Sequence, residues 1–147
     1  MTAIKKHKHK IQLYYGYTAV GMIAITMLYL FYLIIFPLKV ADIELPVMNQ
    51  TIYQAGDNLD YCVSLVKYKD YPATVTIQLL DGYIYHLVTF ESNVSADSMT
   101  VCHNDIKIPV DAQTDEYRLR ITYTYNINPI HKIVIVNESE PFIIYAN

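Results

Sequence analysis

Tryptophan is absent from this 147-residue sequence, which also contains only four glycines and two cysteines. So few glycines exclude phosphate-binding loops and dinucleotide fingerprints, which need several glycines at fixed spacing. The sequence also lacks the GxSxG pattern of serine hydrolases, the HExxH pattern of zinc proteases and the CxxC pattern of dithiol enzymes. We therefore expect no catalytic residue, no cofactor and no metal site, and a protein that is not an enzyme.

Charged residues are missing from residues 11–38. This run exceeds the roughly 20 apolar residues with which a helix crosses a bilayer. It predicts a transmembrane helix that ends at Pro37, because proline lacks the N–H that a continuing helix needs. A cleaved signal peptide is the alternative, but its apolar core is only about 7–15 residues long and is followed by small residues. The large residues that close this run, Leu33 to Phe36, favour an uncleaved anchor.

Basic residues cluster on one side of the apolar run. Positive charge near the end of a membrane span is retained in the cytoplasm. Residues 1–10 are therefore expected to be a basic cytoplasmic tail that also contacts membrane lipid. Residues 39–46 are expected to be a short tether, and residues 42–147 an extracytoplasmic domain. The lysines that flank the span are Lys5, Lys6, Lys8 and Lys10.

Basic residues are scarce in the rest of the chain. Residues 41–147 hold all 14 acidic residues but only six of the 11 basic ones. An acidic module is a poor candidate for nucleic-acid binding, which needs a basic face. We expect membrane lipid and another protein as partners, and no nucleic acid.

Apolar and polar residues alternate with period two along several short segments. The clearest runs from Tyr117 to Asn126, where one face is apolar and the other is polar, as in a half-buried strand. Asp81-Gly82 is a strong signal for a two-residue hairpin. Seven short strands with turns every 8–12 residues predict an all-β, antiparallel Ig-like or fibronectin-III-like sandwich. The expected strands are 42–53, 58–67, 73–80, 83–90, 98–109, 116–126 and 130–145.

Two details refine the sandwich prediction. Tyr117, after Asp115 and Glu116, resembles the tyrosine corner of Ig-like domains, in which the hydroxyl bonds back to the backbone. Leu119 stands where antibody domains have their second cysteine, so the pattern fits a fibronectin-III-like or generic Ig-like domain better. A cupredoxin-type sandwich is an alternative, but its copper site needs clustered His, Cys and Met ligands, and only Cys102-His103 are adjacent.

Cys62 and Cys102 lie in two expected strands that neighbour each other in an Ig-like sheet. Both are at polar-face positions, so a bridge on the outer face of that sheet is feasible. Outside the cytoplasm such a pair usually forms a disulfide. Two unpaired thiols are the alternative.

Two further features concern the surface. Asn49, Asn93 and Asn137 each begin an N-glycosylation acceptor pattern, which matters only in a host that glycosylates proteins. Tyr83, Tyr85 and His86 in the expected hairpin are candidates for a partner surface, since tyrosine is favoured at interfaces. Packing of an edge strand is the alternative explanation for them.

Several segments together resemble small membrane-anchored Ig-like proteins of bacteria and their phages. They are residues 56–61 (Gly-Asp-Asn-Leu-Asp-Tyr), 117–119 (Tyr-Arg-Leu) and 125–130 (Tyr-Asn-Ile-Asn-Pro-Ile), the last together with 140–142 (Glu-Pro-Phe). The resemblance spans residues 40–145. It implies an Ig-like fold and no catalytic residue.

The expected function is a non-enzymatic, membrane-anchored binding or scaffolding module. One alternative is an accessory subunit of a larger membrane complex, in which the small residues Thr18, Gly21 and Ala24 let the anchor approach other helices. Another is a type IV pilin-like subunit. Pilins carry a glutamate five residues into the mature helix, where this chain, counted from Tyr17, has Gly21.

Overall fold

The chain forms one helix followed by a domain of β-strands. The computed structural model describes residues 2–36 and 39–147, with side chains from Tyr14 onward. It divides into a helical unit up to residue 38 and a β unit from Lys39 to Asn147. The prediction of a mostly β protein with one apolar N-terminal helix is confirmed.

Helix α1 extends from Thr2 to Ile35. Within it, the 22 residues Tyr14–Ile35 are long and apolar enough to cross a membrane. No side chain between Tyr14 and Phe36 is buried, and none of these residues is charged. The helix begins nine residues before the predicted span, since lysine forms helices well and no glycine or proline interrupts this segment. It ends just before Pro37, because proline disfavours the helical conformation of the preceding residue.

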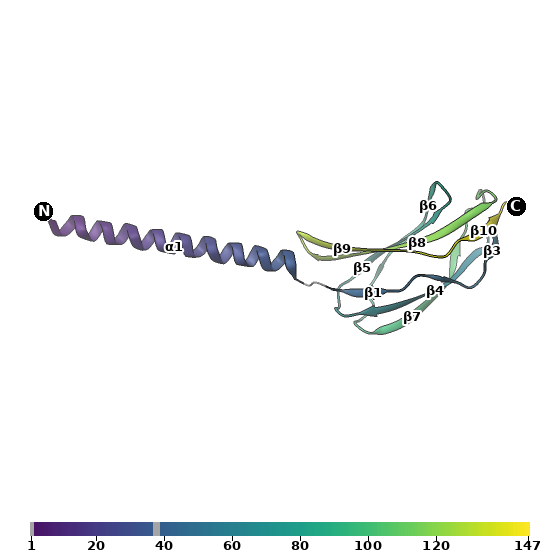
Figure 1. The fold of residues 1–147 in the computed structure, drawn as a ribbon, viewed down its shortest axis with the longest axis horizontal. Helices are drawn as coiled ribbons and strands as arrows, with labels where there is room; N and C mark the ends of the chain where they lie inside the picture. Colours follow the sequence, from purple (N-terminus) through teal and green to yellow (C-terminus); the bar gives the residue numbers. More distant parts are fainter. Residues whose placement is uncertain (1, 37–38) are drawn as a thin grey trace. The chain divides into compact units, whose positions relative to one another are not determined.

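The β domain contains ten strands in two sheets (Figure 1). In the first sheet, β1, β2 and β7 all pair with β4. In the second, the order is β3-β10-β8-β5-β6, and β9 also pairs with β8. All pairs are antiparallel except β10 with β3. The bounds are β1 Ala41–Ile43, β2 Val47–Met48, β3 Ile52–Gln54, β4 Asn58–Lys67, β5 Ala73–Leu80, β6 Ile84–Ser92, β7 Ser98–Lys107, β8 Asp115–Asn128, β9 His131–Glu138 and β10 Phe142–Tyr145.

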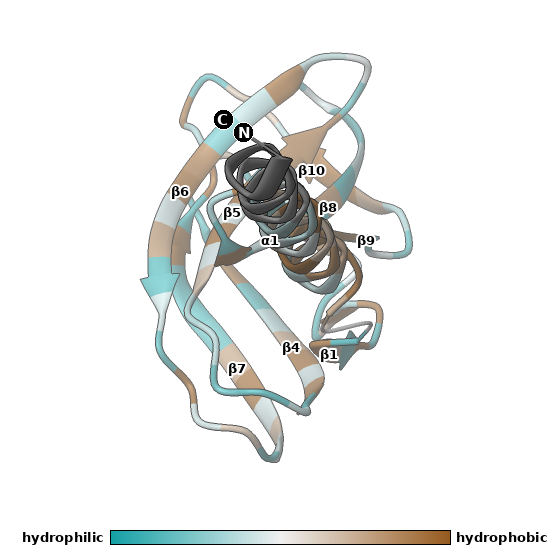
Figure 2. Cartoon of the chain, turned by 90° about the vertical axis from the view of Figure 1, so that its left-hand side faces the viewer, coloured by the Kyte–Doolittle hydropathy of each residue, from teal (hydrophilic) through white to brown (hydrophobic). Residues whose placement is uncertain are grey.

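The core lies between the two sheets and follows the period-two pattern of the sequence. In β4 and β5, every second residue from Leu59 and from Ala73 is buried, while the residues between them are mostly half-exposed. In β8, Tyr117, Leu119 and Ile121 are at most 1% exposed. Successive side chains of a strand point to opposite faces, so this alternation buries one face of each sheet against the other. The alternating bands are visible along β4 and β7 in Figure 2.

The prediction of one continuous strand is wrong for two segments, residues 42–53 and 130–145. Residues 42–53 form β1 and β2 on the first sheet and β3 on the second, because the chain crosses between sheets after Met48. Pro46, which cannot donate a ladder hydrogen bond, lies at the first break. Residues 130–145 form β9 and β10, separated at Ser139–Pro141. Strands 58–67 and 73–80 have the expected bounds, and the others differ by one or two residues at an end.

Ser139 satisfies the backbone where β9 and β10 separate. Its side chain is buried, and its hydroxyl accepts a hydrogen bond from the Leu119 amide at 2.9 Å. The same hydroxyl donates to the Glu140 carbonyl at 2.7 Å, and the Ser139 amide donates to the Leu119 carbonyl. The Ser139 hydroxyl thus replaces a backbone hydrogen bond between β8 and its partner strand, at the point where β9 ends.

We predict that Ser139→Ala lowers the free energy of unfolding by about 1–3 kcal/mol, the cost of leaving a buried amide unsatisfied. Denaturant titration of the full chain in detergent measures this change. The matched control is Ser64→Ala, whose half-exposed hydroxyl lies 3.4 Å from the Thr100 hydroxyl. Equal effects of the two substitutions would contradict the role assigned to Ser139.

Candidate functional site

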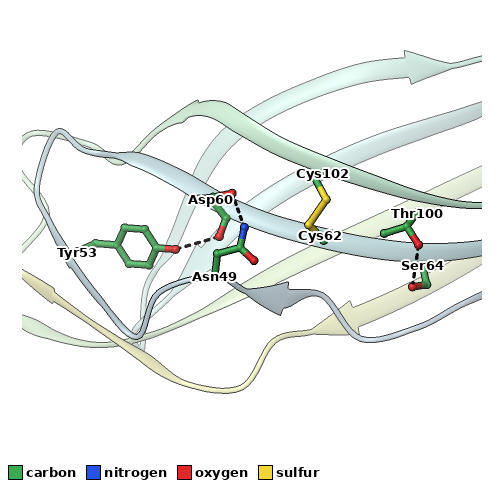
Figure 3. The surroundings of a disulfide bond; sticks show 7 residues. All are labelled: Asn49, Tyr53, Asp60, Cys62, Ser64, Thr100 and Cys102. Carbon is green, nitrogen blue, oxygen red and sulfur yellow. Dashed lines mark hydrogen bonds between the residues drawn. A yellow bond between two sulfur atoms is a disulfide. The ribbon is translucent and has the colours of Figure 1, made fainter.

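Cys62 and Cys102 face each other across β4 and β7, and their sulfurs are 2.03 Å apart (Figure 3). Cys62 is half-buried and Cys102 is exposed, so the disulfide lies on the outer face of the first sheet. Its neighbours on that face include the polar Ser64 and Thr100 and the exposed Val47, which lies opposite Cys62 on β2. In the chain-entropy model, closing a loop of this length stabilises the fold by about 4 kcal/mol. The bridge therefore strengthens one sheet and takes no space from the core.

The three residues proposed as a partner surface lie in different environments. Tyr83 is 76% exposed at the tip of the β5–β6 hairpin, beside the exposed Ile84. Tyr85 is half-buried, and its ring centroid lies 6.2 Å from that of Tyr117. His86 is exposed, and its Nε2 is 2.9 Å from Nε2 of Gln78. The hairpin tip is accessible, but these three side chains do not form one surface, because strand alternation turns Tyr85 inward.

The other surface residues singled out from the sequence are distributed over the chain. The side chains of Lys5, Lys6, Lys8 and Lys10 lie outside the described residues. The amide of Asn49 donates to the Asp60 carboxylate at 2.6 Å, and that of Asn137 to the Ile43 carbonyl at 2.8 Å. Asn93 is exposed beside a small hollow that Lys67 and Tyr71 also line.

The strongest candidate for a binding site lies along the line where the edges of β6 and β7 face each other. We call this line the seam. Two cavities occur there, of about 250 and 210 Å³, and Phe90 and His103 line both. The larger is also lined by Val63, Leu65, Val75, Glu91, Ser92, Val94, Val101 and Tyr123, and the smaller by Val88, Asp105 and Ile106. The seam thus gives access to the apolar space between the sheets.

Tyr61 contributes an unusual group next to the seam. It is fully buried, and its hydroxyl is one of two buried side-chain polar atoms without a hydrogen-bond partner among the described residues. Its ring stacks on His103 with centroids 5.4 Å apart, and Phe90 lies on His103 at 6.0 Å. Burial raises the pKa of Tyr61, and the neighbouring Tyr123 and Asp105 raise it further. Tyr61 lines neither cavity and lies behind His103, which lines both.

This arrangement suits binding. The walls are mainly apolar, and the polar side chains that line the cavities include the half-buried His103 imidazole and two carboxylates, those of Glu91 and Asp105. His103 Nδ1 lies 3.7 Å from the Asp105 carboxylate. Within the described residues, no three His, Cys, Asp or Glu side chains come together as a metal site requires. The seam can therefore take up an apolar group and present the His103 imidazole to it.

Sequence reasoning did not find this site. Phe90 and His103 lie in strands that were expected, yet nothing in the pattern says that β6 and β7 are both edges that face each other. One local signal in the sequence could have indicated the site. In Cys102-His103 the cysteine is at an outward position of the strand, so the next residue, a histidine, is at an inward position.

No protein family model matches the sequence, and no curated protein matches it. Among the solved structures that resemble it weakly are two with a TM-score of 0.38 and 11% sequence identity each. One is the alkylpurine DNA glycosylase AlkC of Pseudomonas fluorescens bound to DNA containing an abasic site analog (72% of this chain, 30% of that one). The other is Spo0M, a sporulation control protein of Bacillus subtilis (74% and 51%). The chain spans about half or less of the length of these proteins.

We predict that Tyr61→Phe leaves the free energy of unfolding unchanged or raises it, because the hydroxyl that it removes has no hydrogen-bond partner among the residues that the structure describes. Tyr117→Phe is the matched control: its hydroxyl donates to the Gln113 carbonyl at 3.1 Å, and its loss costs about 0.5–1.5 kcal/mol. Denaturant titrations of both variants provide the comparison. An equal cost for Tyr61→Phe would mean that its hydroxyl is satisfied in solution.

Stability is also predicted to fall in alkaline solution. Burial raises the pKa of Tyr123 to about 12 and that of Tyr125 above its ordinary value, as it does for Tyr61. Above pH ~10 the unfolded chain loses these protons first, so each such tyrosine lowers stability by about 1.4 kcal/mol per pH unit until its folded pKa is reached. Phenolate absorbance and denaturant titrations across that range measure both effects. Titration of every tyrosine near its ordinary pKa in the folded chain would refute this prediction.

Proposed function

We propose that the protein is a non-enzymatic, membrane-anchored module whose β domain binds an apolar group of a partner outside the cytoplasm. The observation that carries the binding role is the seam, where two adjacent and mainly apolar cavities share Phe90 and His103. Tyr61 stacks on His103, and its buried hydroxyl has no hydrogen-bond partner in the described part of the chain. An apolar pocket with a few well-placed polar groups is the usual form of a binding site.

The anchoring role rests on α1. Its apolar side chains from Tyr14 to Phe36 are exposed, which in water would leave a large apolar surface uncovered. A bilayer covers such a surface and requires that backbone groups bond internally, as they do in a helix. A cleaved signal sequence has a similar composition, so retention of this helix is part of the proposal.

The extracytoplasmic placement rests on two independent features. Lysines precede the apolar run, and such residues stay on the cytoplasmic side. The Cys62–Cys102 disulfide belongs to an oxidising compartment, since cytosolic thiols are kept reduced.

We also propose that the β domain is Ig-like, related to small anchored proteins of bacteria and phages. In support, the first strand region divides between the two sheets, and β3 pairs in parallel with the last strand, β10. The Tyr117 hydroxyl bonds to the backbone four residues upstream, like a tyrosine corner. The disulfide joins two strands of the same sheet, which differs from the bridge between sheets of antibody domains.

Topology can be tested with single added cysteines in the otherwise native chain. We predict that Asn93→Cys, at an exposed position, reacts with a membrane-impermeant thiol reagent added to intact cells. Thr2→Cys should react only after permeabilisation. The reverse pattern would place the domain in the cytoplasm, and release of the domain from the membrane would identify a cleaved signal sequence.

Binding can be tested by photo-crosslinking in the native membrane. A photoreactive phenylalanine analogue at Phe90, in the seam, should yield a product of defined mass. The same analogue at Ile52, which is 53% exposed in β3, is the control and should not yield it. Equal yields at the two positions, or no product from Phe90, would remove the seam as the binding site. A product from the analogue placed within α1 instead would favour the accessory-subunit alternative.

A further inference from the structure

The long edge strands of the β domain differ in how they are protected against pairing with another chain. Within the described residues, no strand pairs with the outer edge of β6, β7 or β9. Strand β6 carries a bulge at Leu87, and β7 carries one at residues 104–105. Bulges and charges on edges prevent strand addition, because they break the row of unpaired N–H and C=O groups.

Strand β9 carries no bulge between Lys132 and Glu138, although its Asn137 amide donates to the Ile43 and Glu44 carbonyls at 2.8 and 3.3 Å. From Lys132 to Glu138 it pairs without interruption with residues 120–126 of β8, so its backbone is regular. Four consecutive β-branched residues, Ile133 to Val136, form its centre, and the only charges are at Lys132 and Glu138. Val134 and Val136 are 56% and 51% exposed, which is high for apolar residues in a strand. This edge is regular, apolar and free of proline, which are the properties that favour addition of another strand.

The sequence of β9 is also complementary to itself. When two copies pair antiparallel about Ile135, Val134 of each copy faces Val136 of the other, and Lys132 faces Glu138. All four side chains point to the same face, because they alternate along one strand. Glu138 is already held in position by Arg120, whose Nη2 lies 2.6 Å from its carboxylate. Opposite charges and β-branched pairs directly across a strand pair each contribute roughly 0.2–1 kcal/mol.

Neighbouring registers match less well. Centring the pair on Val134 would place Lys132 against Val136 and Glu138 against Ile130. Centring it on Val136 would place Val134 against Glu138. Only registers with an even offset keep the exposed faces of both copies together, since a shift by one residue turns every side chain to the other face. The register centred on Ile135 is therefore selected by charge and by apolar contact together.

We propose that β9 pairs antiparallel with β9 of a second copy of this chain, centred on Ile135, to form a two-fold symmetric dimer with one continuous sheet. The same strand on both partners satisfies the requirement that a two-fold interface be self-complementary. The proposal does not depend on what the seam binds. Confinement to a membrane would strengthen the pairing by raising the effective concentration of the second copy.

The register provides a specific test on the full chain in lipid vesicles. Val134→Cys and Val136→Cys variants are prepared separately and as an equal mixture, then oxidised mildly. The mixture should give several-fold more covalent dimer than either variant alone, and mass spectrometry should show residue 134 joined to residue 136. No covalent dimer in the mixture would overturn the proposal. A variant that crosslinks best to itself would overturn this register.

A charge reversal provides a second readout without new cysteines. Lys132→Glu places two carboxylates opposite each other in each half of the dimer. It should lower the fraction of dimer several-fold, as measured by the light-scattering mass of the full chain in detergent. Lys69→Glu, at an exposed position outside the sheets, is the matched control and should have no effect. A monomer at all concentrations, or equal effects of the two variants, would also contradict the dimer.

Discussion

The β domain depends on the pairing of β8 with its neighbours. This 14-residue strand pairs with β5 along one edge and with β9 and then β10 along the other. Its inward row places Tyr117, Leu119 and Ile121 in the centre of the core. Burial of aromatic and aliphatic side chains contributes roughly 1.5–3 kcal/mol each, so this row stabilises the fold by several kcal/mol. Ser139 then satisfies the Leu119 amide where the partner strand changes, which lets β8 pair with two strands in succession.

The strands that alternate cleanly were predictable from the sequence. Strands β4 and β5 have one solvent-facing and one buried face. The alternation of apolar and polar residues therefore identifies these strands and their bounds. The divided first and last strands were not predictable in this way, because their breaks depend on which sheet each part joins. Lys67 shows a related limit: it occupies an inward position at the end of β4, although it is charged. Its ammonium donates to the Val94 carbonyl, and burial lowers the pKa of Lys67.

The candidate site was less predictable than the fold, for a physical reason. Cys62 and Cys102 lie at outward positions of two neighbouring strands, and that pairing follows from local parity. The seam requires two facts about distant parts of the chain: that β6 and β7 are both edges, and that the side chains between them leave space. Neither fact can be read from the alternation of apolar and polar residues within one strand. Tyr61 looked like an ordinary core residue, and only the absence of a partner for its hydroxyl among the described residues distinguishes it.

The two open edges of the second sheet can act together. In the order β9-β8-β5-β6, the proposed dimer edge and the seam strand lie at opposite ends of the sheet. Pairing through β9 would therefore leave β6 uncovered in both copies. A dimer would present two seams to a partner, and two linked sites bind a repeated ligand more strongly than one site does, because the second contact forms at high effective concentration. The bulge at Leu87 keeps β6 from pairing with another strand, so that edge remains available for recognition through side chains.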